Sequence, residues 1–376
     1  MIYFDNAATG GFKPDKTTDA AVKAMKYLNA NAGRSGHRLS AEASFAVYSV
    51  RKKLAAFFNA ESVERVVFTD NCTAALNTAI FGIYREGAEI VTTVTEHNSV
   101  LRPLYKLARE GKISLTVVKP AGKAVTKDDV APYITEKTAA VVLNAVSNVT
   151  GRENDFRSIG AFLKDKNVAF IVDGAQAAGH IPIDMRADGI DVLCAAGHKG
   201  LLSLQGAGVL VFGRKTDIRP LLFGGTGTET FNEDMPDDYP ERLEAGTLSL
   251  PAILSLGGGI DYLSENFPYV SESLKSLSYY LCSALAGKKY LKIYSEPNPC
   301  GIISFSHADV PSQELAETLS EKYDVCARGG FHCAPLMHRF LGTEKSGLLR
   351  ISLSPKNTRR EINFLANALE EITHGI

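Results

Sequence analysis

Short apolar runs alternate with amphipathic stretches between about residues 60 and 215 of this 376-residue chain. Several of the apolar runs are nearly continuous and rich in β-branched residues, as strands covered on both faces are. The predicted strands cover 65–69, 89–94, 114–118, 139–143, 169–173, 191–194 and 209–212, and the predicted helices cover 41–59, 73–83, 100–109 and 155–166. This alternation predicts an α/β fold with a mostly parallel, seven-stranded sheet.

The pattern changes beyond residue 215. Residues 224–238 combine a glycine-rich run with an acidic stretch that contains Pro236, and they predict an exposed excursion. Further predicted elements are helices at 255–265, 272–285 and 312–322 and a strand at 301–305. We therefore expect a large domain over residues 1–260, whose N-terminal segment packs toward a smaller α+β domain over residues 261–376.

Composition narrows the classes of protein. The chain has 41 basic and 42 acidic residues, so its net charge of −1 provides no field that would attract nucleic acid or an anionic membrane. Its six cysteines are scattered without a C-x-x-C pair, which argues against a disulfide framework and a structural zinc site. The N-terminus does not resemble a signal peptide, and no apolar run is long enough for a membrane span. We expect a metal-free protein of the reducing cytoplasm.

Two short segments carry the candidate chemistry. Gly197-His198-Lys199 follows a predicted strand and offers an amine, and residues 328–334 (RGGFHCA) offer the thiol of Cys333. The arginine and the histidine of the second segment are expected as cationic neighbours that stabilise the thiolate. A Schiff-base amine and a separate nucleophilic thiol suggest pyridoxal phosphate chemistry on a sulfur-containing amino acid. The alternatives are an ordinary turn lysine and a buried, inert cysteine.

Other candidate site residues each allow a functional and a structural interpretation. Asp173 ends a buried strand, where it could pair with a pyridinium nitrogen or simply cap the next turn. Residues 69–74 join a strand to a helix, as a phosphate cradle or as a plain N-cap. His97 could lie over an aromatic cofactor or be structural. Arg350 lies in an apolar strand and needs a buried anion, either a substrate carboxylate or a structural salt bridge.

The joint order and spacing of these segments resembles the class V aminotransferase-like enzymes of fold type I, which depend on pyridoxal 5'-phosphate. The resemblance is closest to the group II cysteine desulfurases and selenocysteine lyases, and it covers essentially the whole chain. The matching segments are Tyr3–Thr9, Gly36–Ser40, Val146–Gly151, Val172–Ala177, Gly197–Lys199, Glu244–Thr247, Arg328–Ala334 and Arg350.

The resemblance implies a role for each matching residue. Lys199 would form the Schiff base and then move protons, Cys333 would attack the substrate sulfur, and His97 would stack on the cofactor ring. The other implied cofactor-binding residues are Cys72 through its amide, Thr73, Asp173 at the pyridine nitrogen, Gln176 at the phenolic oxygen and His198, with Gly246 and Thr247 from a second subunit. The implied substrate-binding residues are Asn148, Arg328 and Arg350.

The resemblance also implies a homodimer that converts L-cysteine to L-alanine, leaves a persulfide on Cys333 and passes sulfur to an acceptor protein. L-Selenocysteine is an alternative substrate. A C–S lyase or an aminotransferase of the same fold is a second alternative, and a non-catalytic binding domain is a third. The chain departs from the pattern at Ala196, where relatives often have a hydroxyl residue, at Cys72, where many have threonine, and at Ser203-Leu204, where Gly-Pro is more usual.

Overall fold

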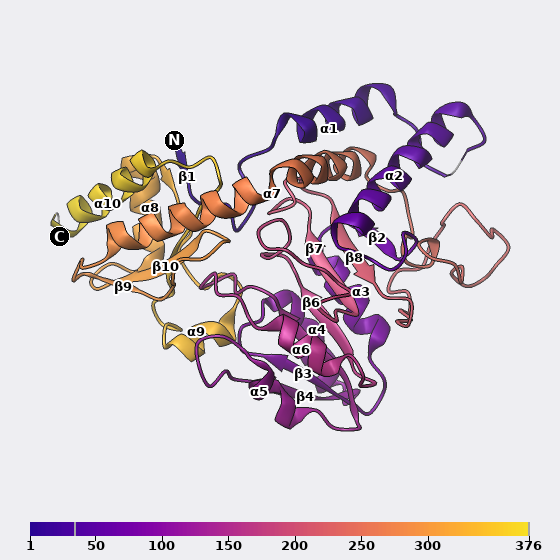
Figure 1. Ribbon diagram of the computed structural model, residues 1–376, viewed down its shortest axis with the longest axis horizontal. Coiled ribbons are helices and arrows are strands. Elements are labelled where there is room, and N and C mark those ends of the chain that lie inside the picture. Colours follow the sequence, from indigo (N-terminus) through magenta and orange to yellow (C-terminus); the bar gives the residue numbers. More distant parts are fainter. Residues whose placement is uncertain (34, 375–376) are drawn as a thin grey trace.

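Figure 1 shows the computed structural model of the protein, which describes residues 1–33 and 35–374. The strands are β1 (Ile2–Tyr3), β2 (Val66–Thr69), β3 (Ala88–Thr93), β4 (Ile113–Val118), β5 (Thr138–Asn144), β6 (Ala169–Asp173), β7 (Val192–Ala196), β8 (Gly208–Phe212), β9 (Leu291–Ile293), β10 (Ile302–His307), β11 (Val325–Cys326) and β12 (Leu349–Ser352). The α-helices are α1 (Asp15–Tyr27), α2 (Arg38–Phe57), α3 (Cys72–Ile83), α4 (Asn98–Arg109), α5 (Lys127–Val130), α6 (Phe156–Leu163), α7 (Leu250–Leu285), α8 (Ser312–Tyr323), α9 (Pro335–Leu341) and α10 (Arg359–His374). Two 3₁₀ turns are η1 (Ala131–Tyr133) and η2 (Glu241–Leu243).

The central sheet has seven strands in the order β2-β8-β7-β6-β5-β3-β4. The pairs from β7 to β4 are parallel, and β8 runs antiparallel to both of its neighbours, β2 and β7. The predicted α/β fold with a mostly parallel seven-stranded sheet is therefore confirmed, and each predicted strand lies within two residues of an observed one. The carboxyl ends of β2, β3, β5, β6 and β7 meet at one edge of this sheet.

Both faces of the sheet are buried, because successive side chains of each strand enter core clusters on opposite sides. Val67 and Ile90 belong to a core cluster with the apolar residues of α3 and α4. Their neighbours Val66 and Val91 belong to a second cluster with α2, α6 and α7. Because consecutive side chains of a strand point to opposite faces, helices on both sides are needed to cover these apolar runs.

One long helix replaces two predicted ones. The segments predicted as separate helices at 255–265 and 272–285 are both part of α7, which spans 36 residues and passes Pro268 without a break. The first half of α7 lies against α1 and α2, and the second half lies against α10 and β10 (Figure 1). Packing along its whole length keeps the helix continuous at the proline, and the boundary expected near residue 260 lies inside it.

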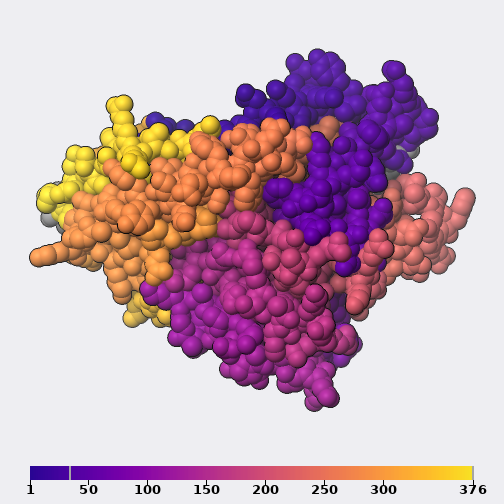
Figure 2. All heavy atoms as spheres, viewed as in Figure 1, coloured from indigo at the N-terminus to yellow at the C-terminus, as the bar shows by residue number. Residues whose placement is uncertain are grey.

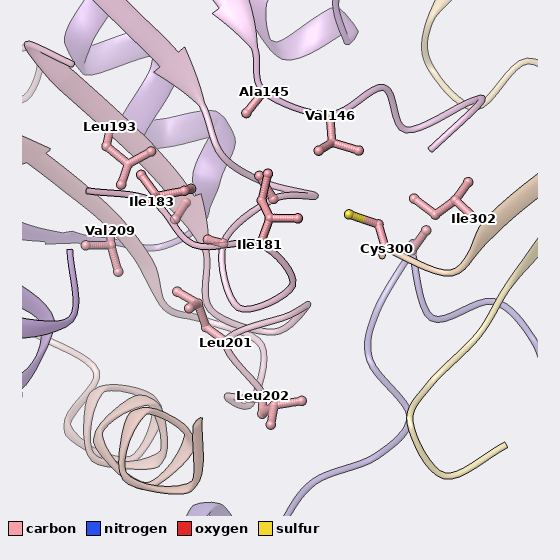
Figure 3. Packing of buried hydrophobic residues seen from close by; sticks show 14 of the residues in the cluster. Ala145, Val146, Ile181, Ile183, Leu193, Leu201, Leu202, Val209, Cys300 and Ile302 are labelled. Atoms are coloured by element: carbon pink, nitrogen blue, oxygen red, sulfur yellow. The ribbon is translucent and has the colours of Figure 1, made fainter. Parts of the chain in front are cut away.

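The C-terminal part contains a three-stranded antiparallel sheet in the order β12-β10-β9. The N-terminal strand β1 also belongs to this part, because it pairs in parallel with β11, a strand more than 300 positions later in the sequence. Figure 3 shows Cys300 and Ile302 of the C-terminal part beside Val146 and Ile181, and all four belong to one buried cluster. The division at residue 260 stays a prediction, since one apolar core runs across it.

The predicted excursion is exposed. The segment between β8 and α7 protrudes beyond α2 at one end of the molecule, as Figures 1 and 2 show. Its most exposed apolar side chains are Leu222, Phe223 and Phe231, which are 65%, 70% and 101% exposed. Within the described part of the chain, no helix combines the length and the apolar character needed to cross a membrane.

Candidate active site

A pocket opens at the carboxyl edge of the central sheet, as expected for ligand sites in α/β sheets. Eight of the predicted site residues line it: Cys72, Thr73, His97, Asn148, Asp173, Gln176, His198 and Lys199. Asn71, Leu76, Ser99, Asn144, Val146, Ala175 and Ala196 complete the lining. The structure therefore brings together residues that lie up to 127 positions apart in the sequence, from the start of α3 to the turn after β7.

Lys199 lies on a turn directly after β7, and glycines fix this turn by their small size. A Cβ on Gly197 would lie 2.6 Å from the carbonyl oxygen of Ala207, and one on Gly200 would lie 2.3 Å from that of Ala178. The predicted turn is thus confirmed. Its glycines are required because neighbouring backbone of the same chain leaves no room for a side chain. Within the described residues the Lys199 amine has no hydrogen bond or ion pair, and burial lowers its pKa.

The N-terminal segment holds this turn from the other side. The carbonyl oxygen of His198 accepts hydrogen bonds from the amide of Gly10 at 2.9 Å and from the Lys13 amine at 3.0 Å. The imidazole Nδ1 of His198 lies 3.0 Å from the Thr9 hydroxyl. Burial lowers the pKa of His198 to about 4 and that of Lys13 to about 8. Three contacts from residues 9–13 therefore fix the residue that precedes Lys199.

Asp173 is the buried acid of the pocket, with 4% of its surface exposed. Its Oδ1 accepts a hydrogen bond from the amide of Ala175 at 2.9 Å and a weaker one from the Cys72 thiol at 3.7 Å. Burial raises the pKa of this carboxyl group, and Lys199 opposes the rise. The side-chain amide nitrogen of Gln176 donates to the carbonyl of Ala7 at 3.0 Å. The side-chain oxygen of Gln176, Oε1, is buried and has no partner among the described residues.

His97 caps α4 and is fixed in one tautomer. Its Nδ1 accepts a hydrogen bond from the backbone amide of Ser99 at 3.1 Å, so the proton of the neutral ring lies on Nε2. The Ser99 hydroxyl lies 2.9 Å from the same nitrogen and 2.7 Å from the Thr73 hydroxyl. Burial, reinforced by Lys199, lowers the pKa of His97 to about 4. A neutral ring is therefore held at the pocket wall by a hydroxyl chain that reaches α3.

Glu96 supports this turn from inside the protein. Its side chain is fully buried, its Oε1 accepts a 2.6 Å hydrogen bond from Thr93, and its Oε2 has no partner among the described residues. Burial raises its pKa to about 8, so the carboxyl group is protonated at neutral pH. Thr95 donates to Asn144 at 2.7 Å, which ties the end of β3 to the end of β5.

The Cys333 loop approaches the pocket from the C-terminal part. The Cys333 side chain is exposed, and Cys333 and His332 have φ angles of 56° and 50°, a left-handed conformation that costs non-glycine residues of order 1 kcal/mol. Two hydrogen bonds hold the loop: the amide of Asn98 donates to the carbonyl of Cys333, and the side chain of Asn148 donates to that of His332, both at 2.7 Å. The thiol is thus exposed on a loop with a fixed backbone.

His332 does not act as the expected cationic neighbour. Its side chain is 3% exposed, and burial together with Arg350 lowers its pKa well below the ordinary value. The ring is therefore neutral, and the expectation of a stabilising charge from this histidine is wrong. Two arginines supply the positive charge on this side of the pocket, Arg328 and the buried Arg350. Arg328 is half-buried and forms no ion pair within the described residues.

Arg350 is 1% exposed, as its apolar strand predicted, and it has a counter-ion within the chain. Its Nη2 lies 2.9 Å from Oδ1 of Asp5, and its Nη1 donates to the carbonyl of Asn148 at 3.1 Å. Its Nε has no partner among the described residues. Arg328 is the backbone partner of Arg350 in an antiparallel bridge, so two arginines lie opposite each other on neighbouring segments.

Gly246 and Thr247 do not line the Lys199 pocket. Gly246 lines a second cavity, and the Asn31 amide donates to the Thr247 hydroxyl at 3.3 Å. Glu244, two positions before Gly246, anchors this pair of residues, because it forms a buried bidentate ion pair with Arg51 at 2.8 and 2.9 Å. The chain's own fold therefore fixes this loop away from its own pocket.

The polar residues Ser99, Asn144 and Asp5, at or beside the site, were missed in the sequence. Ser99 and Asn144 are small polar residues that follow or end a predicted strand, and this position was the available signal. Asp5 lies in a segment that matched the family, yet nothing local indicates its partner, because Arg350 lies 345 positions away. Ser203, at a departure from the family pattern, contacts Ser255 of α7 at 2.8 Å and so ties the Lys199 turn to that helix.

The seven-stranded sheet, with a lysine and a buried aspartate at its carboxyl edge, defines the fold type I class of pyridoxal phosphate enzymes. The family model of the class-V aminotransferases matches residues 2–365, and the chain belongs to this family. It is 32% identical to a probable cysteine desulfurase of Methanothermobacter thermautotrophicus, over 99% of this chain and 94% of that protein. It is 30% identical to a cysteine desulfurase of Serratia proteamaculans, over 99% and 93% of the two chains.

Solved structures give the same picture. The apo structure of a cysteine desulfurase from Thermococcus onnurineus matches with a TM-score of 0.90 and 29% identity, over 100% of this chain and 95% of that one. A cysteine desulfurase from Escherichia coli matches with a TM-score of 0.88 and 25% identity, over the same shares of the two chains. The resemblance inferred from the motifs is thereby confirmed.

Proposed function

We propose that this protein is a pyridoxal phosphate-dependent cysteine desulfurase, which converts L-cysteine to L-alanine and receives the sulfur on Cys333. The observation that carries the proposal is the pairing of a free, desolvated Lys199 amine in the pocket with an exposed thiol on a loop that is hydrogen-bonded to the pocket wall. An amine in such surroundings is suited to Schiff-base formation, and the thiol is suited to accept sulfur.

The residues of the pocket fit pyridoxal 5'-phosphate. Asp173 is a buried carboxylate that still needs a cationic partner, and a protonated pyridine nitrogen supplies one. The exposed Thr73 hydroxyl, the first amides of α3, including that of Cys72, and His198 would hold the phosphate. Gln176 would bind the phenolic oxygen, and His97 would cover the ring. When bound, the cofactor supplies an electron sink for the substrate's α-carbon.

The substrate side is positively charged. Arg328 and Arg350 would bind the carboxylate of the amino acid, and the unpartnered Oδ1 of Asn148 remains for a donor on the substrate or the cofactor. His97 is neutral with its proton on Nε2, so it can donate a hydrogen bond but adds no charge. Lys199 would move the proton between the substrate's α-carbon and the cofactor.

Sulfur transfer to Cys333 is balanced without any oxidant. The thiolate of Cys333 attacks the sulfur of bound L-cysteine, the C–S bond breaks, and its electron pair passes to the carbon skeleton, which takes up a proton and leaves as L-alanine. The product on the protein is a persulfide. A thiol can reduce this persulfide, or an acceptor protein can receive its outer sulfur. The exposure of Cys333 suits this handover, because an acceptor must reach the sulfur.

Two alternatives within the family are less well supported. A C–S lyase that forms pyruvate, or an aminotransferase, has no need of an exposed cysteine held beside the pocket. Selenocysteine lyase activity uses the same groups, since selenium takes the place of sulfur in the substrate.

We further propose that the protein works as a homodimer in the cytoplasm. Gly246 and Thr247 lie outside their own chain's pocket and would complete the phosphate site of a second copy. The exposed apolar residues Leu222, Phe223 and Phe231 of the neighbouring excursion fit a surface that a second copy covers. Sedimentation analysis tests this: a dimer is expected, and a monomer that retains the cofactor would contradict it.

Product analysis tests the proposed reaction. The purified protein, loaded with the cofactor, is incubated with L-cysteine and a reducing thiol. Alanine and sulfide in equal amounts are expected. Pyruvate and ammonia would show a lyase instead, and a parallel incubation with L-selenocysteine distinguishes the substrate preference.

A further inference from the structure

Three polar side chains form a short hydrogen-bonded chain between the start of α3 and the cap of α4. The Thr73 hydroxyl lies 2.7 Å from the Ser99 hydroxyl, which lies 2.9 Å from Nδ1 of His97. All three residues line the pocket that contains Lys199. Thr73 is exposed, whereas Ser99 and His97 are half-buried, so the Thr73 end of the chain is the more open to an incoming ligand.

The backbone fixes the direction in which the protons of this chain point. An amide nitrogen can only donate, so the 3.1 Å contact from the Ser99 amide makes Nδ1 of His97 an acceptor. The Ser99 hydroxyl can therefore bond to Nδ1 only as a donor, and this bond uses its single proton. The Thr73 hydroxyl must then donate to Ser99. With these hydrogen bonds, the proton of Thr73 points toward α4 and its lone pairs face the pocket.

A phosphate group requires the opposite direction. Its oxygens are negatively charged acceptors, so the Thr73 hydroxyl must turn its proton toward them. Thr73 then becomes an acceptor for Ser99, whose only proton turns from His97 to Thr73. The lone pair of Nδ1 is left to the Ser99 amide alone. This change costs little, because the amide and the hydroxyl shared that lone pair and the bond between Thr73 and Ser99 is kept with its polarity reversed.

We propose that Ser99 is a positioning residue that couples phosphate binding at Thr73 to the hydrogen bonding of the His97 ring. The inference rests on the proposed function, since it takes Thr73 as part of the phosphate site and His97 as the ring that covers the cofactor. Before phosphate binds, the hydroxyl and the amide of Ser99 both hold Nδ1. Once phosphate is bound, the ring keeps the amide contact and becomes richer in electrons, because one hydrogen bond that polarises it is lost.

Nitrogen NMR of the imidazole rings measures this coupling independently of catalysis. The full chain, with isotopically labelled histidine, is measured without ligand and after saturation with inorganic phosphate or with pyridoxal 5'-phosphate. His97→Gln identifies the Nδ1 resonance by its disappearance. In the wild type both ligands should move this resonance to lower field, because a ring nitrogen that accepts fewer hydrogen bonds is less shielded. In Ser99→Ala it should lie at lower field from the start, and each ligand should move it less than in the wild type.

Two further variants separate the hydroxyl of Ser99 from its place in the helix. Ser99→Thr retains a hydroxyl and should restore the wild-type shift. Ser276→Ala, at an exposed position of α7, is the control and should leave the shift unchanged. Thr73→Val removes the hydroxyl at the other end of the chain and leaves the cap of α4 intact, so inorganic phosphate should no longer move the His97 resonance.

The outcomes distinguish this inference from the proposed function. Equal ligand-induced shifts in the wild type and in Ser99→Ala would overturn the inference, as would a wild-type Nδ1 resonance that stays in place when pyridoxal 5'-phosphate is bound. In both cases the cofactor is bound, so the proposed function is untouched. A wild type that binds neither inorganic phosphate nor pyridoxal 5'-phosphate would overturn the proposed function, and the inference with it.

Discussion

The backbone amide of Asn98 donates a 2.7 Å hydrogen bond to the carbonyl of Cys333, so the thiol loop of the C-terminal part is joined to the first turn of α4. His97, the cap of that helix, lies directly before Asn98. The position of the candidate nucleophile and that of the ring at the pocket wall are therefore coupled through one backbone contact. The side chain of Cys333 remains exposed and free to move.

This arrangement predicts that the thiol is required for sulfur transfer but not for cofactor binding. Cys333→Ala should reduce alanine formation from L-cysteine by about a hundredfold or more, because the nucleophile is removed. It should leave the cofactor absorbance unchanged, because the thiol does not line the pocket. Cys282→Ala, which removes a half-buried thiol on α7, is the matched control and should retain activity. Persistent alanine formation by Cys333→Ala would remove this residue from the mechanism.

Lys199 should be the point of cofactor attachment. In Lys199→Ala the absorbance of protein-attached cofactor should disappear, while free cofactor should still be retained weakly by the other pocket residues. Lys23→Ala, at an exposed site on α1, should show the wild-type spectrum. Absorption spectra after gel filtration measure both, and an unchanged spectrum in Lys199→Ala would place the attachment elsewhere.

Glu96 predicts a particular pH dependence of stability. Its folded-state pKa of about 8 lies above the unfolded value of 4.5, so the folded state binds the proton more tightly. Stability from this group is present below about pH 4.5 and is lost as pH rises toward 8, by roughly 1 kcal/mol per pH unit. Glu96→Gln cannot titrate and should lack this loss. Urea unfolding of both proteins between pH 5 and pH 8 tests it: a constant difference in free energy between them would refute the prediction.

Gly208 predicts a packing limit at the turn that we propose as the phosphate site. A Cβ at this position of β8 would lie 2.4 Å from the carbonyl carbon of Asn71 and 2.6 Å from the Thr69 hydroxyl. Gly208→Ala should therefore displace the start of α3, destabilise the protein by about 1–3 kcal/mol and weaken cofactor binding. Gly213→Ala is the control just beyond the same strand, where a Cβ meets only ordinary contacts at 3.6 Å. Equal cofactor affinities in the two variants would contradict the expected displacement.

Much of the architecture was predictable because it is local. Each buried strand is a continuous apolar run, and the rule that ligands bind at the carboxyl ends of parallel strands placed Asp173 and Lys199 at one edge. The single helix α7 was not predictable in the same way, since Pro268 is a helix-breaking signal that packing on both sides overrides. The charge of His332 was mistaken for the same kind of reason, because burial, which no local pattern records, keeps the ring neutral.

The sequence by itself determined the class of fold and the family and supplied the candidate reactive groups, because periodicity and short motifs are properties of neighbouring residues. The tertiary structure decided which groups are neutral, which are paired and which remain available. Asp5 meets Arg350 across 345 positions, and residues 9–13 support the turn before Lys199. Such contacts, and the desolvation that shifts each pKa, exist only once distant segments are folded against one another, since both depend on distances in space.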